Sequence, residues 1–211
     1  MPFFFYSLLF LLAFSIIEAS NYPIFTKDEL NKIAGLSGNT AKNRVLDYTK
    51  NVNSFKKLPK QKQLLQVNDY LNQLPHQADI VNHNKIDYWE TPKEFLTCGF
   101  GDCEDYAIIK YFTLLKLGFS KKKLFITTVF EKFTGRHHMV LSYFETKNKP
   151  PLVLDNLSYK ILDLKVREDL KANIFINATG IYKINKDNNL IKMGKAPKVF
   201  NELMMRVKKE S

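Results

Sequence analysis

The strongest constraint on the fold is a change in the spacing of apolar residues at Gly118. Before it, Ala107, Tyr111 and Leu114 recur at the spacing of a buried helix face, which predicts a helix over 103–117. After it, the apolar residues fall in short β-branched and aromatic runs separated by turn residues, as is typical of strands. Helices followed by strands indicate an α+β fold with an antiparallel sheet packed on the 103–117 helix. The expected strands are 124–130, 138–144, 152–154, 174–177 and 180–184.

The chain before this helix predicts an N-terminal helical layer. Thr26 and Glu29 have the spacing of a capping box, and the helix that they open is expected to end at Gly35 and Gly38. Further helices are expected from Ala41, from Pro59 to before Pro75, at Thr91-Pro92 and after Pro197. The 211 residues contain no internal repeat, so we expect one domain over 21–211.

The first 20 residues are typical of an export signal. Residues 3–17 are almost entirely apolar and are followed by Glu18, Ala19 and Ser20, with a small-residue cleavage site near Ala19. The apolar run is short for a membrane span, which needs about 20 residues. No basic residue precedes the run, so an uncleaved N-terminal anchor is the alternative. Either interpretation places the rest of the chain outside the cytoplasm.

The net charge of +11 comes mainly from lysines that are spread along the chain. Nucleic-acid binding would favour arginine and a recognisable binding module, whereas the chain has only four arginines. We therefore expect no nucleic-acid partner. An acidic protein partner or an anionic membrane surface is a better match for this charge, and direct membrane attachment is expected only through the leader if it is uncleaved.

The segment 98–107 carries the best candidate for a nucleophile, Cys103. Glycines at 99 and 101 let the backbone turn sharply just before the predicted helix. A thiol in the first turn of a helix lies where the dipole and free N–H groups favour its thiolate. The structural alternative is a small buried side chain, but the acidic neighbours Asp102 and Glu104 are unusual around a core residue.

A cysteine nucleophile needs a base and a residue that orients the base. His137 and His138 begin a predicted strand, and because side chains alternate across a strand only one of them can face the thiol. Their spacing does not choose between them. Asp155, at the end of the next strand, is the candidate for the orienting acid, and a turn at Asp155-Asn156 is the alternative role for it.

Two other arrangements of these residue types are weaker. His76, Asp79 and His83 are irregularly spaced and no further nitrogen or sulfur ligand lies near them in the sequence, so we do not expect a zinc site. A disulfide between Cys98 and Cys103 would close a very short loop and add little stability. Whether Cys98 is free or paired stays open at this point.

Four motifs identify a family resemblance. They are YWETP at 88–92, GDCEDYA at 101–107, HMVL at 138–141 and LDN at 154–156. Together they resemble the bacterial transglutaminase-like cysteine peptidases and, within that group, the LapG-type periplasmic proteases. The resemblance implies a papain/transglutaminase-like fold. It also implies Cys103 as nucleophile, His138 as base and Asp155 as orienting acid.

The acids around the thiol also require an explanation. Asp102, Glu104 and Asp105 would raise the pKa of Cys103, because like charge opposes formation of the thiolate. Capping the helix is one role for them, although a single acid would suffice. Clustered carboxylates suit Ca²⁺, whose charge would cancel their effect. The family resemblance likewise implies calcium dependence, with the ion at Asp102, Glu104 and Asp105.

These expectations combine into a calcium-dependent cysteine endopeptidase. The resemblance implies that it cuts the N-terminal region of a large cell-surface adhesin and so controls biofilm attachment. It also implies an inner-membrane receptor of the LapD type, which senses cyclic di-GMP, as a second partner. The alternatives are a transglutaminase that passes the acyl group to an amine, and a calcium-binding adaptor without catalysis.

Overall fold

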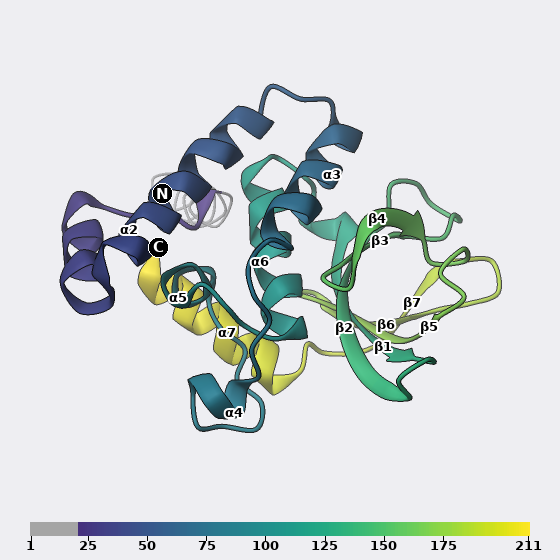
Figure 1. Cartoon of the computed structure of the whole chain (residues 1–211). Helices are drawn as coiled ribbons and strands as arrows, with labels where there is room; N and C mark the ends of the chain where they lie inside the picture. The colour runs from purple at the N-terminus through teal and green to yellow at the C-terminus, as the bar shows by residue number, and fades with distance from the viewer. Residues whose placement is uncertain (1–20) are drawn as a thin grey trace, which may run out of the picture.

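The computed structural model describes residues 21–211 and shows a single sheet beside a group of helices (Figure 1). The seven strands lie in the order β4-β3-β2-β1-β5-β6-β7, and every neighbouring pair is antiparallel. The predicted α+β class with an antiparallel sheet is therefore confirmed. The leader expected at 1–20 lies outside the described residues. Across 21–211, none of the helices combines the length and apolar character that a membrane crossing requires.

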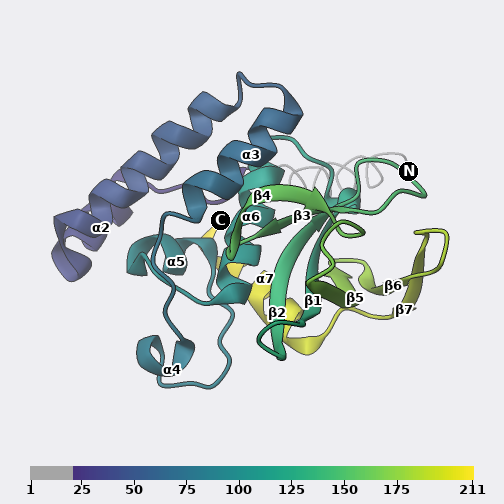
Figure 2. The ribbon, with the colours of Figure 1, turned by 45° about the vertical axis from the view of Figure 1, so that its right-hand side comes forward.

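The other helices form one layer, and α6 lies between that layer and the sheet (Figures 1 and 2). It contacts α3 and α5 on one side and β1, β2 and β3 on the other. Residues 105–114 of α6 are all buried, because a helix in this position has no solvent-facing side. The helices are α2 Lys27–Phe55, α3 Lys60–Leu71, α4 Asp79–Asn82, α5 Pro92–Cys98, α6 Cys103–Lys116, the 3-10 turn η1 Lys121–Lys123 and α7 Lys198–Glu210.

The sheet contains each predicted strand and two more. Its strands are β1 Leu124–Glu131, β2 Arg136–Tyr143, β3 Leu152–Asp155, β4 Ser158–Asp163, β5 Leu170–Asn177, β6 Gly180–Ile184 and β7 Leu190–Gly194. The two additional strands, β4 and β7, form the edges of the sheet and are mostly exposed or half-buried. An edge strand pairs on one side only and needs no continuous buried face, so its sequence carries a weak apolar pattern.

The first two predicted helices meet at Gly38 and together form the single element α2. Thr26 and Glu29 form the expected capping box, with Thr26 N–H donating to Glu29 Oε2 at 2.7 Å and Glu29 N–H to Thr26 Oγ1 at 3.2 Å. The chain does not form a separate loop after Gly35. Instead, Gly38 takes a left-handed conformation (φ +84°) and bends a nearly continuous helix, α2. The two predicted helices are thus the two arms of one kinked element.

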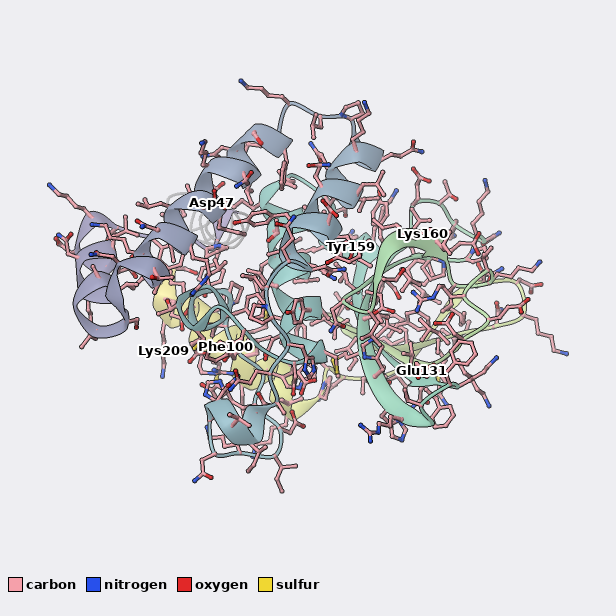
Figure 3. All side chains as sticks on the ribbon, viewed as in Figure 1. Asp47, Phe100, Glu131, Tyr159, Lys160 and Lys209 are labelled. Atoms are coloured by element: carbon pink, nitrogen blue, oxygen red, sulfur yellow. The ribbon has the colours of Figure 1, made fainter. Side chains whose placement is uncertain are left out.

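Side chains fill the space between the helical layer and the sheet (Figure 3). The main cluster joins residues of α2, α3, α5, α6 and α7 to residues of β1, β2 and β3. At one margin, the Tyr159 hydroxyl of β4 donates to the Asn72 carbonyl just after α3, at 3.4 Å. The position of α6 relative to the sheet is therefore set by a continuous apolar core.

Candidate active site

Cys103 is the first residue of α6, and two glycines shape its approach. Gly99 ends α5 in a left-handed conformation (φ +84°), which a residue with a side chain adopts only with strain. At Gly101, a Cβ atom would lie 2.7 Å from Asp105 Oδ2 and 2.9 Å from Phe95 Cδ2, so only glycine fits against these groups. The backbone can therefore pass close to Phe95 and Asp105 and place the thiol at the start of α6.

Asp105 is buried and fixes this turn. Its Oδ2 accepts from the Asp102 N–H at 3.1 Å, and its Oδ1 accepts from the Glu90 N–H at 2.8 Å. Burial and then the charge of Glu90 raise the pKa of Asp105 to about 9. Asp105 thus joins the segment before α5 to the start of α6, which is a structural role in addition to the predicted metal-binding one.

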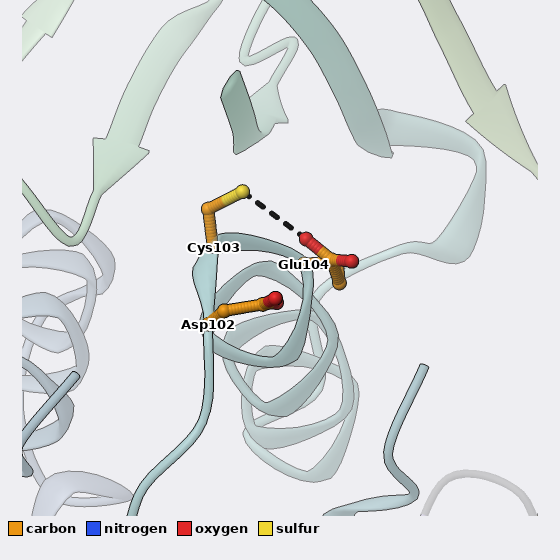
Figure 4. Close-up of side chains that lie close together, drawn as sticks. All are labelled: Asp102, Cys103 and Glu104. Atoms are coloured by element: carbon orange, nitrogen blue, oxygen red, sulfur yellow. Dashed lines mark hydrogen bonds between the residues drawn. The ribbon is translucent and has the colours of Figure 1, made fainter. Parts of the chain in front are cut away.

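The Cys103 thiol lies 3.1 Å from Glu104 Oε2 and donates to it (Figure 4). Burial, followed by the charge and hydrogen bond of Glu104 and the charge of Asp102, raises the pKa of the thiol well above its usual range. The Met139 backbone N–H of β2 acts in the opposite sense and lowers this pKa. The start of α6 therefore faces β2 near the residue that follows His138.

His138 and Asp155 form a buried pair on neighbouring strands. His138 Nε2 lies 2.8 Å from Asp155 Oδ1, and the two side chains are 8% and 0% exposed. An ionised carboxylate only accepts hydrogen bonds, so Nε2 carries the proton and Nδ1 is the available basic nitrogen. His137 is exposed instead, and its ring lies edge-on to Phe130 at 6.0 Å. Because side chains alternate across the strand, His138 faces Asp155 and His137 faces solvent.

Two further contacts fix the Asp155 carboxylate. Leu157 N–H donates to its Oδ1 at 3.0 Å, and Arg167 Nη2 donates to its Oδ2 at 2.7 Å. Burial alone would raise the pKa of Asp155, but its contacts with His138, Leu157 and Arg167 together hold it down at about 2. Arg167 was not among the predicted site residues, because nothing in its spacing from Asp155 indicates that the 163–170 segment turns back toward the site.

The carboxylates around Cys103 belong to a larger acidic cluster, which we define as Asp79, Asp87, Asp102, Glu104 and Asp105. Oxygens of Asp79, Asp102 and Asp105 lie within 4.8 Å of one another, and so do oxygens of Asp79, Asp87 and Glu104. Asp79 reaches the cluster because the Gln77 N–H donates to the Gly101 carbonyl at 2.8 Å. The structure thus adds Asp79 and Asp87 to the three acids that the sequence indicated.

His76 and His83 do not join the acidic cluster. His76 is exposed and its backbone pairs with Gly101, whereas His83 Nε2 is hydrogen-bonded to the buried carboxylate of Glu90. Cys98 and Cys103 are both free thiols. Asp79 lies in a polar segment, which is the sequence signal that could have indicated it. It was considered only for zinc, which favours nitrogen and sulfur ligands, and not for calcium, which favours carboxylate oxygens.

The acidic cluster fits a hard divalent cation. Asp79 Oδ1 and Asp102 Oδ1 are buried and accept no hydrogen bond from the described residues. Within 21–211, no lysine or arginine forms an ion pair with any of the five acids. Buried, uncompensated carboxylate oxygens are costly without a counter-charge, and carboxylate oxygen is the ligand that Ca²⁺ prefers.

Comparisons with known proteins point to one family. The family model described as bacterial transglutaminase-like cysteine proteinase matches residues 41–168. The calcium-bound LapG of Legionella pneumophila is 35% identical, with 84% of this chain and 98% of that chain covered and a TM-score of 0.69. The EGTA-treated form is 34% identical, with 84% of this chain and 97% of that chain covered and a TM-score of 0.71. A third LapG structure from the same organism is 36% identical, with 88% and 97% covered and a TM-score of 0.70. Among curated proteins, none matches the chain.

Proposed function

Because the chain belongs to the bacterial transglutaminase-like cysteine proteinase family and is a cysteine peptidase of the transglutaminase-like fold, we propose that it is a calcium-dependent endopeptidase. Its triad would be Cys103, His138 and Asp155. The observation that carries this proposal is the buried His138–Asp155 pair on β2 and β3, two strands that α6 contacts, together with Cys103 as the first residue of α6. Nucleophile, base and orienting acid thus come from three adjacent elements.

The proposed reaction is acyl transfer to water. His138 Nδ1 takes the thiol proton while the Cys103 sulfur attacks the peptide carbonyl, and the Nε2–H bond to Asp155 stabilises the imidazolium. The C–N bond then breaks as His138 returns the proton to the leaving amine, which leaves a thioester on Cys103. Water, deprotonated by His138, hydrolyses the thioester. The Cys103 backbone N–H at the start of α6 is our candidate donor to the oxyanion.

Calcium is part of the proposal because of the acidic cluster. Asp102 and Glu104 would hold the ion together with Asp105, and Asp79 and Asp87 are the further ligands that their proximity supports. Bound Ca²⁺ would supply positive charge beside the thiol, where the neighbouring side chains Asp102 and Glu104 are acidic and raise its pKa. The calcium-bound form of Legionella pneumophila LapG supports this assignment.

The biological setting rests on resemblance. We place the protein in the periplasm, exported by its leader, with the N-terminal region of a large adhesin as its substrate and biofilm attachment as the process that it controls. A receptor of the LapD type that senses cyclic di-GMP would bind the protease and withhold it from the adhesin. The similarity to LapG over 84% of this chain supports the setting.

The test uses N-terminal fragments of large adhesins from the same genome, mixed with the purified protein in calcium or in EGTA. We expect one cut with calcium and none in EGTA or with Cys103→Ala, while the matched Cys98→Ala variant stays active. Cleavage that persists in Cys103→Ala would remove Cys103 as nucleophile. Incorporation of a labelled amine into a glutamine-containing protein without peptide cleavage would favour the transglutaminase alternative instead.

A further inference from the structure

We infer that Arg167, held by Asp169, is a positioning residue that fixes the Asp155 carboxylate and thereby the proton position on His138. The inference rests on the proposed triad, but its main test does not need protease activity. Arg167 follows β4 in the segment that leads to β5, and it is 7% exposed. A buried arginine at this place requires partners, and both of its carboxylate partners can be identified.

Arg167 joins two acids through different parts of its guanidinium. Its Nε donates to Asp169 Oδ1 at 2.8 Å and its Nη2 to Asp169 Oδ2 at 2.6 Å, a bidentate pair that fixes the plane of the group. The same Nη2 donates to Asp155 Oδ2 at 2.7 Å. Because Asp169 sets the orientation of the guanidinium, the donor that faces Asp155 is itself held in place.

The two oxygens of Asp155 have separate partners. Oδ1 accepts from His138 Nε2 at 2.8 Å and from Leu157 N–H at 3.0 Å, whereas the hydrogen bond from Arg167 goes to Oδ2. Without Arg167, a fully buried oxygen would lose its hydrogen bond and the carboxylate could rotate about its Cβ–Cγ bond. The Nε2–H tautomer of His138, which leaves Nδ1 free for the thiol, would then be less strongly favoured.

Among the described residues, Arg167 is the only lysine or arginine that is hydrogen-bonded to the Asp155 carboxylate. Lys110 of α6 interacts with Asp155 without a hydrogen bond, and its burial lowers its own pKa to about 7. Its Nζ is buried and forms no hydrogen bond with the described residues. The competing explanation is that the Arg167–Asp169 pair simply closes the turn before β5, in which case its loss would lower stability without affecting His138.

The decisive experiment measures the His138 tautomer by ¹⁵N NMR in the Cys103→Ala chain, at a pH where the imidazole is neutral. We expect protonated Nε2 and unprotonated Nδ1 with Arg167 present, and a mixture of tautomers with Arg167→Met. Asp169→Asn should give a smaller change in the same direction. Lys165→Met is the matched control, because it removes an exposed cation from the same turn, and it should leave the signals unchanged.

Kinetics in the otherwise unchanged chain complete the test. We expect Arg167→Met to lower kcat by about 10–100-fold with little change in KM, as for other residues that orient a catalytic group. Arg167→Lys keeps a positive charge between Asp155 and Asp169 and should therefore recover part of the loss in kcat. An unchanged tautomer in the folded Arg167→Met chain, or in the folded Asp169→Asn chain if Arg167→Met does not fold, would overturn the inference. Absence of protease activity with an intact tautomer effect would instead refute the proposed function alone.

Discussion

At the scale of single residues, the Glu104 carboxylate has two competing partners in the proposed mechanism, the Cys103 thiol and the calcium ion. In the structure its Oε2 accepts a hydrogen bond from the Cys103 thiol, which keeps the sulfur protonated. Its burial, and then the hydrogen bond and charge of Asp102, raise its own pKa as well. The thiol becomes a good nucleophile only when the negative charge of Asp102 and Glu104 is compensated. Reactivity of Cys103 is therefore expected to depend on the state of its neighbour.

This dependence predicts how fast Cys103 is alkylated. In a Cys98→Ala background, which leaves one thiol, iodoacetamide should modify Cys103 slowly in EGTA and faster in calcium. Glu104→Gln should raise the rate in EGTA, because it removes the nearest negative charge, and should reduce the response to calcium. Mass spectrometry of samples quenched over time measures the rates. Equal rates for Cys103 under all these conditions would contradict this account of the thiol.

Asp155 predicts a contribution to acid stability. Its folded-state pKa of about 2 lies below the value of about 4 in unfolded chains. The stabilisation is therefore complete above pH ~4 and is lost as the pH falls toward ~2, at a magnitude of about 2–3 kcal/mol. Urea unfolding across this pH range should show a smaller fall in the free energy of unfolding for Asp155→Asn than for the unchanged chain. The exposed Asp187→Asn control should retain the full fall.

At the scale of elements, the one-turn helix α4 is the least obvious part of the site. It has no extended apolar face, and it reaches the start of α6 because residues 76 and 77 pair with the Gly101 backbone. The Asp79 carboxylate also accepts a hydrogen bond from the Tyr88 N–H, which holds the two ends of the 79–88 segment together. Through these contacts α4 presents Asp79 to Asp102 and Asp105.

Asp79→Asn is thus expected to weaken calcium binding. At a hundredfold excess over Kd, calcium should stabilise the unchanged protein by about 2.7 kcal/mol, which corresponds to a Tm increase of about 5–10 °C. Asp79→Asn should show a clearly smaller increase, whereas Asp69→Asn, an exposed acid on α3, should behave like the unchanged protein. Thermal unfolding with calcium and with EGTA measures the difference. An undiminished increase in Asp79→Asn would exclude Asp79 as a ligand.

The elements that the sequence predicted are those with a strong periodic pattern. The 103–117 helix and the strands around His138 are buried on regular faces, so spacing alone located them. Edge strands β4 and β7 lack such a face, and the contacts of Asp79 and Arg167 arise from chain segments that meet only after folding. The choice of His138 over His137 likewise required the pairing of β1, β2 and β3, or the family resemblance.

At the scale of the whole molecule, the site spans the boundary between α6 and the sheet. The nucleophile is on the helix, whereas the base and its orienting acid are on β2 and β3. Their relative position is set by the shared core, where Leu141 of β2 is fully buried and pairs in register with Ile126 and Leu154. Catalytic geometry in this protein therefore depends on tertiary packing, and less on any local segment.

Leu141→Ala tests this dependence. A fully buried leucine truncated to alanine should lower the free energy of unfolding by about 2–5 kcal/mol. It should also lower kcat under conditions where the variant is still folded, because the cavity lets β2 shift relative to α6. Leu65→Ala, at a half-exposed position of α3, should cost far less and leave kcat unchanged. Circular dichroism and cleavage kinetics on the same samples check both parts, and full kcat in folded Leu141→Ala would contradict them.

The most direct test of the central claim is to trap the acyl-enzyme. The protein is mixed with an adhesin fragment in calcium, quenched rapidly in acid and mapped by mass spectrometry. We expect a thioester between the N-terminal product of the cut and Cys103, which is absent in EGTA and in Cys103→Ala. Cleavage of the fragment with no adduct on Cys103, or with the adduct on Cys98, would contradict it.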